Sequence, residues 1–216
     1  MERVTGPQNI LPTDSDEKLK TALNKAKQVL LSGGVVAYPT ESFYGLAVDI
    51  ENSMAIDKLF ALKQRDKNNP VLIILPGMET LDEYVDEIPV QAQRLITEFW
   101  PGGLTMLFRA GSNISPLLTA NTGKIGIRYS SHPVATALAG SIGRPVTGTS
   151  SNISGHAPCI MAEEVFNYFG SAVDLILDSG PAKGGPGSTI LDVTVDPCVV
   201  IREGMVSKKD IERVVL

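Results

Sequence analysis

The segment PVLIILP at residues 70–76 is the feature that most restricts the fold of this chain. All residues between its two prolines are apolar, which is typical of a strand that is buried on both faces. Such strands belong to α/β proteins, in which helices cover both sides of a sheet. The sequence on either side should therefore alternate between helices and strands.

Helical periodicity and short apolar runs do alternate along the chain. Helices are expected from Asp14 or Ser15 to Gly33, and from Asn52 or Ser53 to about residue 65, because apolar residues recur there behind a capping side chain. Further helices are expected at 78–86, 89–99, 133–143, 162–170 and 207–216, and strands at 35–39, 104–110, 124–128, 144–148, 173–180, 188–193 and 198–204. The late strands are compatible with hairpins, which predicts a mixed sheet. The pattern predicts one α/β domain over residues 14–216, preceded by a tail at 1–13.

Composition and charge exclude several classes of protein. No apolar run approaches the roughly 18 residues of a membrane span, and the first twenty residues contain no apolar signal core, so a cytoplasmic protein without membrane contact is expected. The only cysteines, Cys159 and Cys198, are too far apart for a CxxC pair, which argues against a zinc site or a disulfide framework. The net charge of −5 argues against a dedicated nucleic-acid binder and leaves a local basic patch open.

Three common kinds of enzyme site are not present in the sequence. His132 and His156 lack the spacing of metal ligands. The run GTSSN carries Asn152 where a nucleophile elbow needs glycine. The run GPAKGGPGST carries Pro186 and Gly187 where a phosphate-binding loop needs its lysine.

Polar loops that follow apolar strands remain as candidates for a site. They are PTESFYGLA (39–47), KQRDKNN (63–69), FWPGGLT (99–105), KIGIRYSSHP (124–133) and GTSSNISG (148–155). Each has a structural explanation of its own, such as a turn, or cations placed at a helix C-terminus. Together they favour a small-molecule anion site, because open α/β sheets bind ligands at strand ends.

Two of these loops carry the strongest indications. Arg128 ends an apolar strand, and a buried arginine needs a carboxylate partner, from the protein or from a ligand. Ser150, Asn152 and Ser154 alternate between Gly148 and Gly155, so hydroxyl, amide and backbone N–H groups could surround phosphate or carboxylate oxygens.

The loops occur in an order that resembles the YrdC-like family, which includes the threonylcarbamoyl-AMP synthases of tRNA modification. The resemblance rests on PTESFYGLA, LFALKQR, FWPGGLT, IGIRYSSHP, TSSNISG, GSTILD and VVIREG, and extends over about residues 20–205. It implies a twisted open mixed sheet flanked by helices, of the YrdC/RibB-like kind, with a concave and positively lined face. It also implies synthesis of L-threonylcarbamoyl-AMP from L-threonine, bicarbonate and ATP, with release of pyrophosphate and with Mg²⁺ on the nucleotide.

The resemblance also implies roles for individual residues. Lys63 and Arg65 match the family's K-x-R pair, which would hold the triphosphate as the catalytic cations. Further positions near ATP are Asn69, Lys124, Ser150, Asn152 and Arg202. The threonine side would comprise Thr40, Ser42, Arg128, Gly148 and Ser188. No protein ligand is expected for Mg²⁺, which would be carried by the ATP phosphates.

Five positions depart from the family pattern, and two of them bear on the substrate. Asp66 stands where many members have proline, and Ile74 stands where some have a histidine that contacts threonine. The others are Gly103, Ser151 and Ile160. The alternatives are therefore a paralogue that acts on another carbamoyl or amino-acid substrate, or a module that binds double-stranded RNA. The expected partner is the threonylcarbamoyl transferase of the pathway, with RNA or tRNA contact left open.

Overall fold

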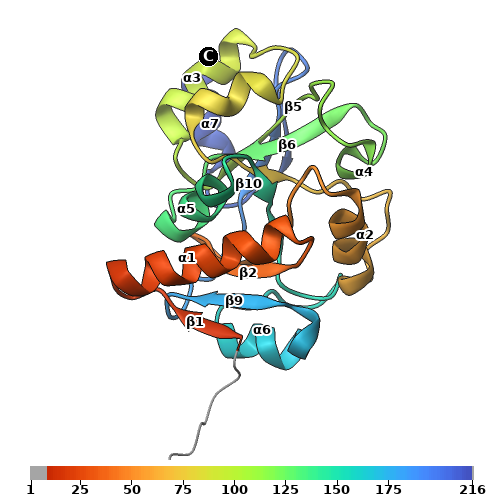
Figure 1. Ribbon diagram of the computed structural model, residues 1–216. Coiled ribbons are helices and arrows are strands. Elements are labelled where there is room, and N and C mark those ends of the chain that lie inside the picture. The colour runs from red at the N-terminus through yellow and green to blue at the C-terminus, as the bar shows by residue number, and fades with distance from the viewer. Residues whose placement is uncertain (1–8, 216) are drawn as a thin grey trace, which may run out of the picture.

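A computed structural model describes residues 9–215 of the chain. The strands form two mixed sheets, one in the lower and one in the upper half of Figure 1. The lower sheet has the order β1-β9-β2-β3-β8 and the upper sheet the order β11-β10-β5-β6-β4-β7. The predicted α/β class and the mixed pairing are confirmed, with the strands divided between two sheets.

The elements follow the chain in this order: β1 (Ile10–Pro12), α1 (Asp16–Leu31), β2 (Val36–Pro39), β3 (Tyr44–Ala47), α2 (Ser53–Leu62), β4 (Ile73–Ile74), the 3₁₀ helix η1 (Met78–Glu83), α3 (Val90–Phe99), β5 (Leu104–Arg109), α4 (Pro116–Thr119), β6 (Lys124–Arg128), α5 (Pro133–Ile142), β7 (Val146–Thr147), β8 (Thr149–Ser150), α6 (Ala162–Phe169), the 3₁₀ helix η2 (Gly170–Ala172), β9 (Leu175–Asp178), β10 (Thr189–Asp192), β11 (Val199–Arg202) and α7 (Lys208–Val215).

Capping side chains begin the first two long helices where the sequence predicts. The Ser15 side chain accepts a hydrogen bond from the Lys18 N–H at 3.4 Å, and the Asn52 side chain accepts one from the Ala55 N–H at 3.0 Å. Each cap satisfies a backbone donor that has no partner inside the helix. The four-residue spacing of Ala22, Ala26 and Leu30 gives α1 its buried face, which packs against α5 and β2.

The two sheets are joined through the segment that follows β3. The Val48 N–H donates to Thr147 Oγ1 at 3.0 Å, and the Thr147 N–H donates to the Val48 carbonyl at 3.2 Å. The pair Asp49 and Val146 forms an isolated antiparallel bridge beside them. The largest buried apolar cluster takes residues from strands of both sheets, so the described residues form one domain.

Five elements were not predicted, or were predicted as something else, and one of them is the 3₁₀ helix η2 between the expected helix at 162–170 and the expected strand at 173–180. Residues 10–12 lie in the expected tail but form β1, which pairs in parallel with β9, while residues 1–8 lie outside the described residues. The strands β3 and β8 fall inside segments predicted as loops, and the short helix α4 was missed.

Four residues of the apolar run at 70–76 are buried as predicted, namely Val71, Ile73, Ile74 and Leu75, whereas Leu72 is only partly buried and Pro70 is exposed. The run contributes only the two-residue strand β4. Two of its other backbone groups form hydrogen bonds outside the pairing of β4 with its neighbours. Val71 N–H donates to the Leu118 carbonyl at 2.9 Å, and the Leu72 carbonyl accepts from Gly148 N–H at 2.8 Å.

Two kinds of feature are absent from residues 9–215. None of their helices has the length and apolar character needed to cross a membrane. Nor do His, Cys, Asp and Glu side chains in this range gather in threes or more where a metal ion could bind.

Candidate functional site

A cavity of about 500 Å³ lies between the two sheets. Its walls come from β2, β3 and β8 of one sheet and from β5, β6, β10 and β11 of the other, together with the loops that follow them. The polar loops singled out in the sequence meet here because β8, which pairs with β3, continues directly from β7 of the other sheet.

Most of the predicted site residues lie on the cavity wall. They are Thr40, Ser42, Arg65, Arg128, Gly148, Ser150, Asn152, Ser188 and Arg202. The exceptions are Lys63, Asn69 and Lys124, which are absent from the wall for three different reasons.

Lys63 lies behind the wall, under the loop that follows β8. Its side chain is 1% exposed, and its ammonium group donates to the Asn152 carbonyl at 2.8 Å and to the Ser150 carbonyl. The Lys63 carbonyl in turn accepts from the Ser154 N–H at 3.0 Å. Burial, with a smaller contribution from the Arg65 charge, lowers the pKa of Lys63 to about 8. Lys63 therefore holds the shape of the loop and does not project into the cavity.

Asn69 and Lys124 are positioned by other contacts. Asn69 is exposed, and its carbonyl accepts from Arg65 Nε at 3.2 Å, while the Pro70 carbonyl accepts from Arg65 Nη2 at 2.8 Å. These two bonds fix the direction of the Arg65 guanidinium. Lys124 begins β6 and bonds Asp192 Oδ2 at 2.6 Å, which directs its ammonium group to a structural ion pair.

Among the described residues, the charged side chains on the wall are three arginines, and no carboxylate group lines it. Burial lowers the pKa of Arg65 and of Arg202, and Arg128 adds to the effect at Arg202. Arg202 Nη2 donates to the Ser188 carbonyl at 2.7 Å, which ties this cation to the segment before β10. Partly buried cations without carboxylates at the surface of a cavity suit a multiply charged anion.

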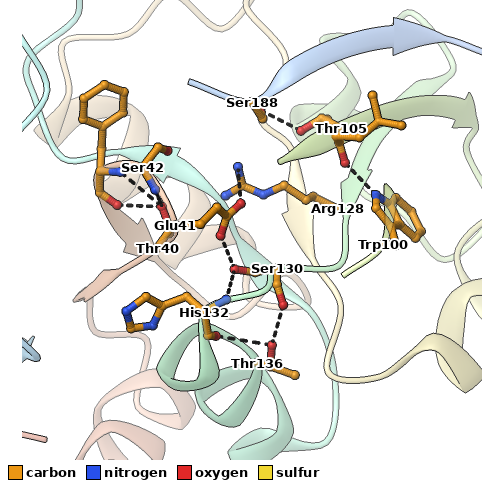
Figure 2. Close-up of polar contacts among 12 residues, drawn as sticks. Thr40, Glu41, Ser42, Trp100, Thr105, Arg128, Ser130, His132, Thr136 and Ser188 are labelled. Carbon is orange, nitrogen blue, oxygen red and sulfur yellow. Dashed lines mark hydrogen bonds and ion pairs between the residues drawn. The ribbon is translucent and has the colours of Figure 1, made fainter. Parts of the chain in front are cut away.

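Glu41 supplies the carboxylate that the burial of Arg128 requires. Arg128 Nη1 lies 3.2 Å from Glu41 Oε1, and both side chains are 6% exposed. Ser130 Oγ donates to Glu41 Oε2 at 2.5 Å, and the His132 N–H donates to Ser130 Oγ at 3.1 Å. Figure 2 shows this chain of contacts running from the guanidinium of Arg128 to the first turn of α5.

Hydroxyl and amide groups make up much of the remaining polar wall. Thr40 Oγ1 donates to the Phe43 carbonyl at 2.7 Å, and Thr105 Oγ1 donates to Ser188 Oγ at 2.9 Å. Asn152 Nδ2 donates to the His156 carbonyl at 2.7 Å, while its Oδ1 is buried without a partner in the described part of the chain. That oxygen remains able to accept a hydrogen bond from a ligand.

Gly148 lies at a close approach between the loop and β4. A Cβ atom at this position would overlap Leu72 Cδ1 and would lie 2.9 Å from Ile74 Cδ1. Ile74 itself is fully buried and is not part of the cavity wall, so the departure from histidine puts no polar group there.

Sequence reasoning missed some contributors to the site. Tyr38 was predicted to be a core residue of a strand, but it lines the cavity. Its hydroxyl donates to the Thr147 carbonyl at 3.0 Å, and burial raises the pKa of this hydroxyl. The partnership of Glu41 with Arg128 was also missed. The sequence feature that could have indicated this pairing is a single glutamate between two buried apolar strands, because a buried glutamate needs a cation as its partner.

Comparisons with known proteins agree on one family. The Sua5/YciO/YrdC family model, described as "Telomere recombination", matches residues 28–204. The threonylcarbamoyl-AMP synthase of Bacillus subtilis is 33% identical over 192 residues, which cover 88% of this chain and 56% of that protein. The threonylcarbamoyl-AMP synthase of Photobacterium profundum is 35% identical over 185 residues, which cover 84% of this chain and 98% of that protein.

A solved structure resembles almost the whole length of this chain. The crystal structure of P. abyssi Sua5 complexed with L-threonine superposes with a TM-score of 0.89 at 29% identity, covering 96% of this chain and 60% of that one. This chain therefore spans little more than half the length of the Bacillus subtilis relative and of the P. abyssi structure.

Proposed function

The chain belongs to the Sua5/YciO/YrdC family, and from this membership we propose that it is an L-threonylcarbamoyl-AMP synthase. It joins L-threonine, bicarbonate and ATP, and releases pyrophosphate. Its product serves a transferase that modifies adenosine 37 of tRNA. The observation that carries the proposal is one cavity that brings together Arg65, Arg128 and Arg202. RNA contact and a cytoplasmic location remain predictions from the sequence.

The ATP side of the cavity is assigned to Arg65, Ser150, Asn152 and Arg202. Arg65 and Arg202 are partly buried cations that offer planar N–H groups to phosphate oxygens. Lys63 acts through the loop that it holds, and the carbonyl of Asn69 fixes Arg65. Lys124, bonded to Asp192, has at most an indirect part. Because the described wall carries no carboxylate, the residues present fit a Mg²⁺ ion held by ATP phosphates.

The threonine side is assigned to Arg128, Thr40, Ser42, Gly148 and Ser188. Arg128 binds the substrate carboxylate. Its guanidinium can donate a further hydrogen bond, because its buried Nε has no hydrogen-bond partner among residues 9–215. Gly148 lets the loop on this side of the cavity pass close to Leu72, which a Cβ atom would overlap, and the hydroxyl groups offer donors and acceptors to the threonine hydroxyl.

The chemistry needs no nucleophile from the protein. The amine of threonine forms a bond to the carbon of bicarbonate, and one C–O bond of bicarbonate breaks, so that this oxygen leaves as water with a proton from the amine. An oxygen of the resulting carbamate then attacks the α-phosphate of ATP. The bond from the α-phosphate to the bridging oxygen breaks, and pyrophosphate leaves with the electron pair. The protein contributes by holding ATP and the threonine-derived carbamate in one cavity and by neutralising charge at the phosphates.

Pyrophosphate release from Mg-ATP and bicarbonate, with each amino acid added in turn, tests the proposal. Stimulation by threonine alone is the expected result. Stimulation by another amino acid would favour a paralogue with a different substrate. If ATP binds but no amino acid stimulates release, the synthase assignment is wrong.

A further inference from the structure

The contact between Glu41 and Arg128 differs from an ordinary structural ion pair. The two charged groups lie 3.2 Å apart, but no hydrogen bond joins them. Glu41 Oε1 and Arg128 Nε are both buried and have no hydrogen-bond partner in the described part of the chain. One is an acceptor and the other a donor, and Arg128 lines the cavity. Buried polar groups in native proteins are normally satisfied, so the free Nε of Arg128 points to a ligand in the cavity, while Glu41, which does not line the wall, acts on that ligand through its charge.

The Glu41 carboxylate is fixed in place from the side opposite Arg128. Its Oε2 accepts from Ser130 Oγ at 2.5 Å, and the Ser130 carbonyl accepts from Thr136 Oγ1 at 3.0 Å. Figure 2 shows these residues on the α5 side of the carboxylate and the guanidinium on the other. The neighbours of Glu41 in sequence, Thr40 and Ser42, line the cavity. The negative charge therefore stays at a set position at the edge of the proposed amino-acid subsite.

This arrangement makes the net charge of the ligand important. The pair carries no net charge, and neither residue is more than 7% exposed, so charges act there with little screening by water. A ligand with only a carboxylate leaves the site with a net negative charge. A zwitterion leaves it neutral, because an ammonium group offsets the charge of Glu41 while its carboxylate meets Arg128.

We propose that Glu41 is a specificity-determining residue that makes the Arg128 subsite prefer an α-amino acid zwitterion to a carboxylic acid without an amino group. The inference rests on the proposed function and deepens it, since it explains how a cationic cavity avoids capturing simple carboxylates. Glu41 acts through its charge beside Arg128 and is not assigned a bond to the reacting atoms.

The test compares two ligands that differ only in the amino group. Affinities of L-threonine and of 3-hydroxybutyrate are measured by calorimetry for the unchanged chain and for Glu41→Gln. We expect the unchanged chain to prefer threonine, and Glu41→Gln to reduce the ratio of the two affinities at least about tenfold. A purely structural role would weaken both ligands in parallel and leave the ratio unchanged.

Asp178→Asn is the matched control. It removes one carboxylate charge near the same cavity, where Asp178 accepts from the hydroxyl of the wall residue Tyr44 at 3.2 Å and has no bond to Arg128. Its affinity ratio should stay within about twofold of that of the unchanged chain. If Glu41→Gln does not fold, Glu41→Ala supplies the same comparison with a smaller side chain.

The outcomes separate this inference from the proposed function. An unchanged ratio in a folded Glu41 variant, with threonine still bound, overturns the inference alone. Stimulation of pyrophosphate release by another amino acid overturns the threonine assignment, and the comparison is then made with that acid and its deamino analogue. If the unchanged chain binds no amino acid, both are wrong.

Discussion

The ammonium group of Lys63 donates to the backbone carbonyl of Asn152 at 2.8 Å, from below the loop that bears Asn152. A second bond reaches the Ser150 carbonyl, so one buried cation holds both ends of the segment that supplies two wall residues. The family resemblance assigned this lysine to the triphosphate directly. In the structure its ammonium group is hydrogen-bonded to the loop and lies outside the cavity wall, and the triphosphate role stays a prediction.

Lys63→Met should destabilise the protein. The methionine keeps most of the volume of the side chain but leaves two buried carbonyl groups without their donor, which costs about 2–4 kcal/mol. The free energy of unfolding in urea measures the loss, and the KM for ATP should rise as the loop relaxes. Lys25→Met, on the exposed face of α1, is the control. Unchanged stability in Lys63→Met would show that the two carbonyl contacts are dispensable.

Stability should also depend on pH through Lys63. Burial lowers its pKa from 10.5 to about 8, so between these values the unfolded chain binds more protons than the folded one. The contribution of Lys63 to stability is therefore fully present above pH 10.5 and is lost as the pH falls through about 8. The difference in unfolding free energy between the unchanged chain and Lys63→Met should grow by up to about 3 kcal/mol as the pH rises over this window. A constant difference would contradict the assignment of a buried ammonium.

The Glu41–Arg128 pair should show strong coupling in a double-mutant cycle. Arg128→Ala leaves the Glu41 charge buried without a partner, and we expect a loss of about 3–5 kcal/mol. Glu41→Ala likewise leaves the Arg128 charge buried without a partner. The double variant should therefore be more stable than the sum of the two single losses implies.

The exposed ion pair of Lys67 and Asp57, at 2.5 Å, provides the matched cycle. Its side chains are 60% and 51% exposed, so a coupling below about 1 kcal/mol is expected. Equal coupling in the two cycles would mean that burial does not strengthen the Glu41–Arg128 contact.

Gly204→Ala should disturb the cavity from behind. A Cβ atom there would overlap the Gly187 carbonyl oxygen and would lie 2.7 Å from the Ser188 carbonyl carbon, both of them backbone atoms. The clash must displace the segment that bears Ser188, so we expect a loss of stability of about 2 kcal/mol or more and a higher KM for ATP and for L-threonine.

Gly140→Ala is the companion substitution. Gly140 lies inside α5, and a Cβ atom there meets no described atom of another element within 4 Å. Alanine should therefore stabilise the helix by about 0.5–1 kcal/mol and leave activity unchanged. Thermal melting of both variants measures the two effects, and a Gly204→Ala protein as stable as Gly140→Ala would contradict the close packing of Gly204 against Gly187 and Ser188.

The sequence predicted the elements whose signals are local. Caps at Ser15 and Asn52, and the strand at 124–128, follow from residue type and spacing alone. The hairpin strand β3 was missed because its four residues are ordered by pairing with β2, where Gly45 allows Tyr38 to pass close by. The strand β1 was missed because its three residues depend on β9, which lies far away in the sequence.

The sequence predicted which residues belong to the site better than it predicted how their side chains are arranged. Loops such as 148–155 could be recognised as polar ends of strands, and several of their residues do line one cavity. The direction of the Lys63 side chain depends on where the loop after β8 passes, which no local pattern encodes. The pairing of Glu41 with Arg128 likewise depends on the arrangement of two sheets.

The most direct test of the central claim is the mass of the product formed with ¹³C-labelled bicarbonate, Mg-ATP and L-threonine. We expect threonylcarbamoyl-AMP that carries the label, together with one pyrophosphate for each product molecule. An unlabelled threonyl-AMP, or no adenylate in a folded protein that binds ATP, would contradict it.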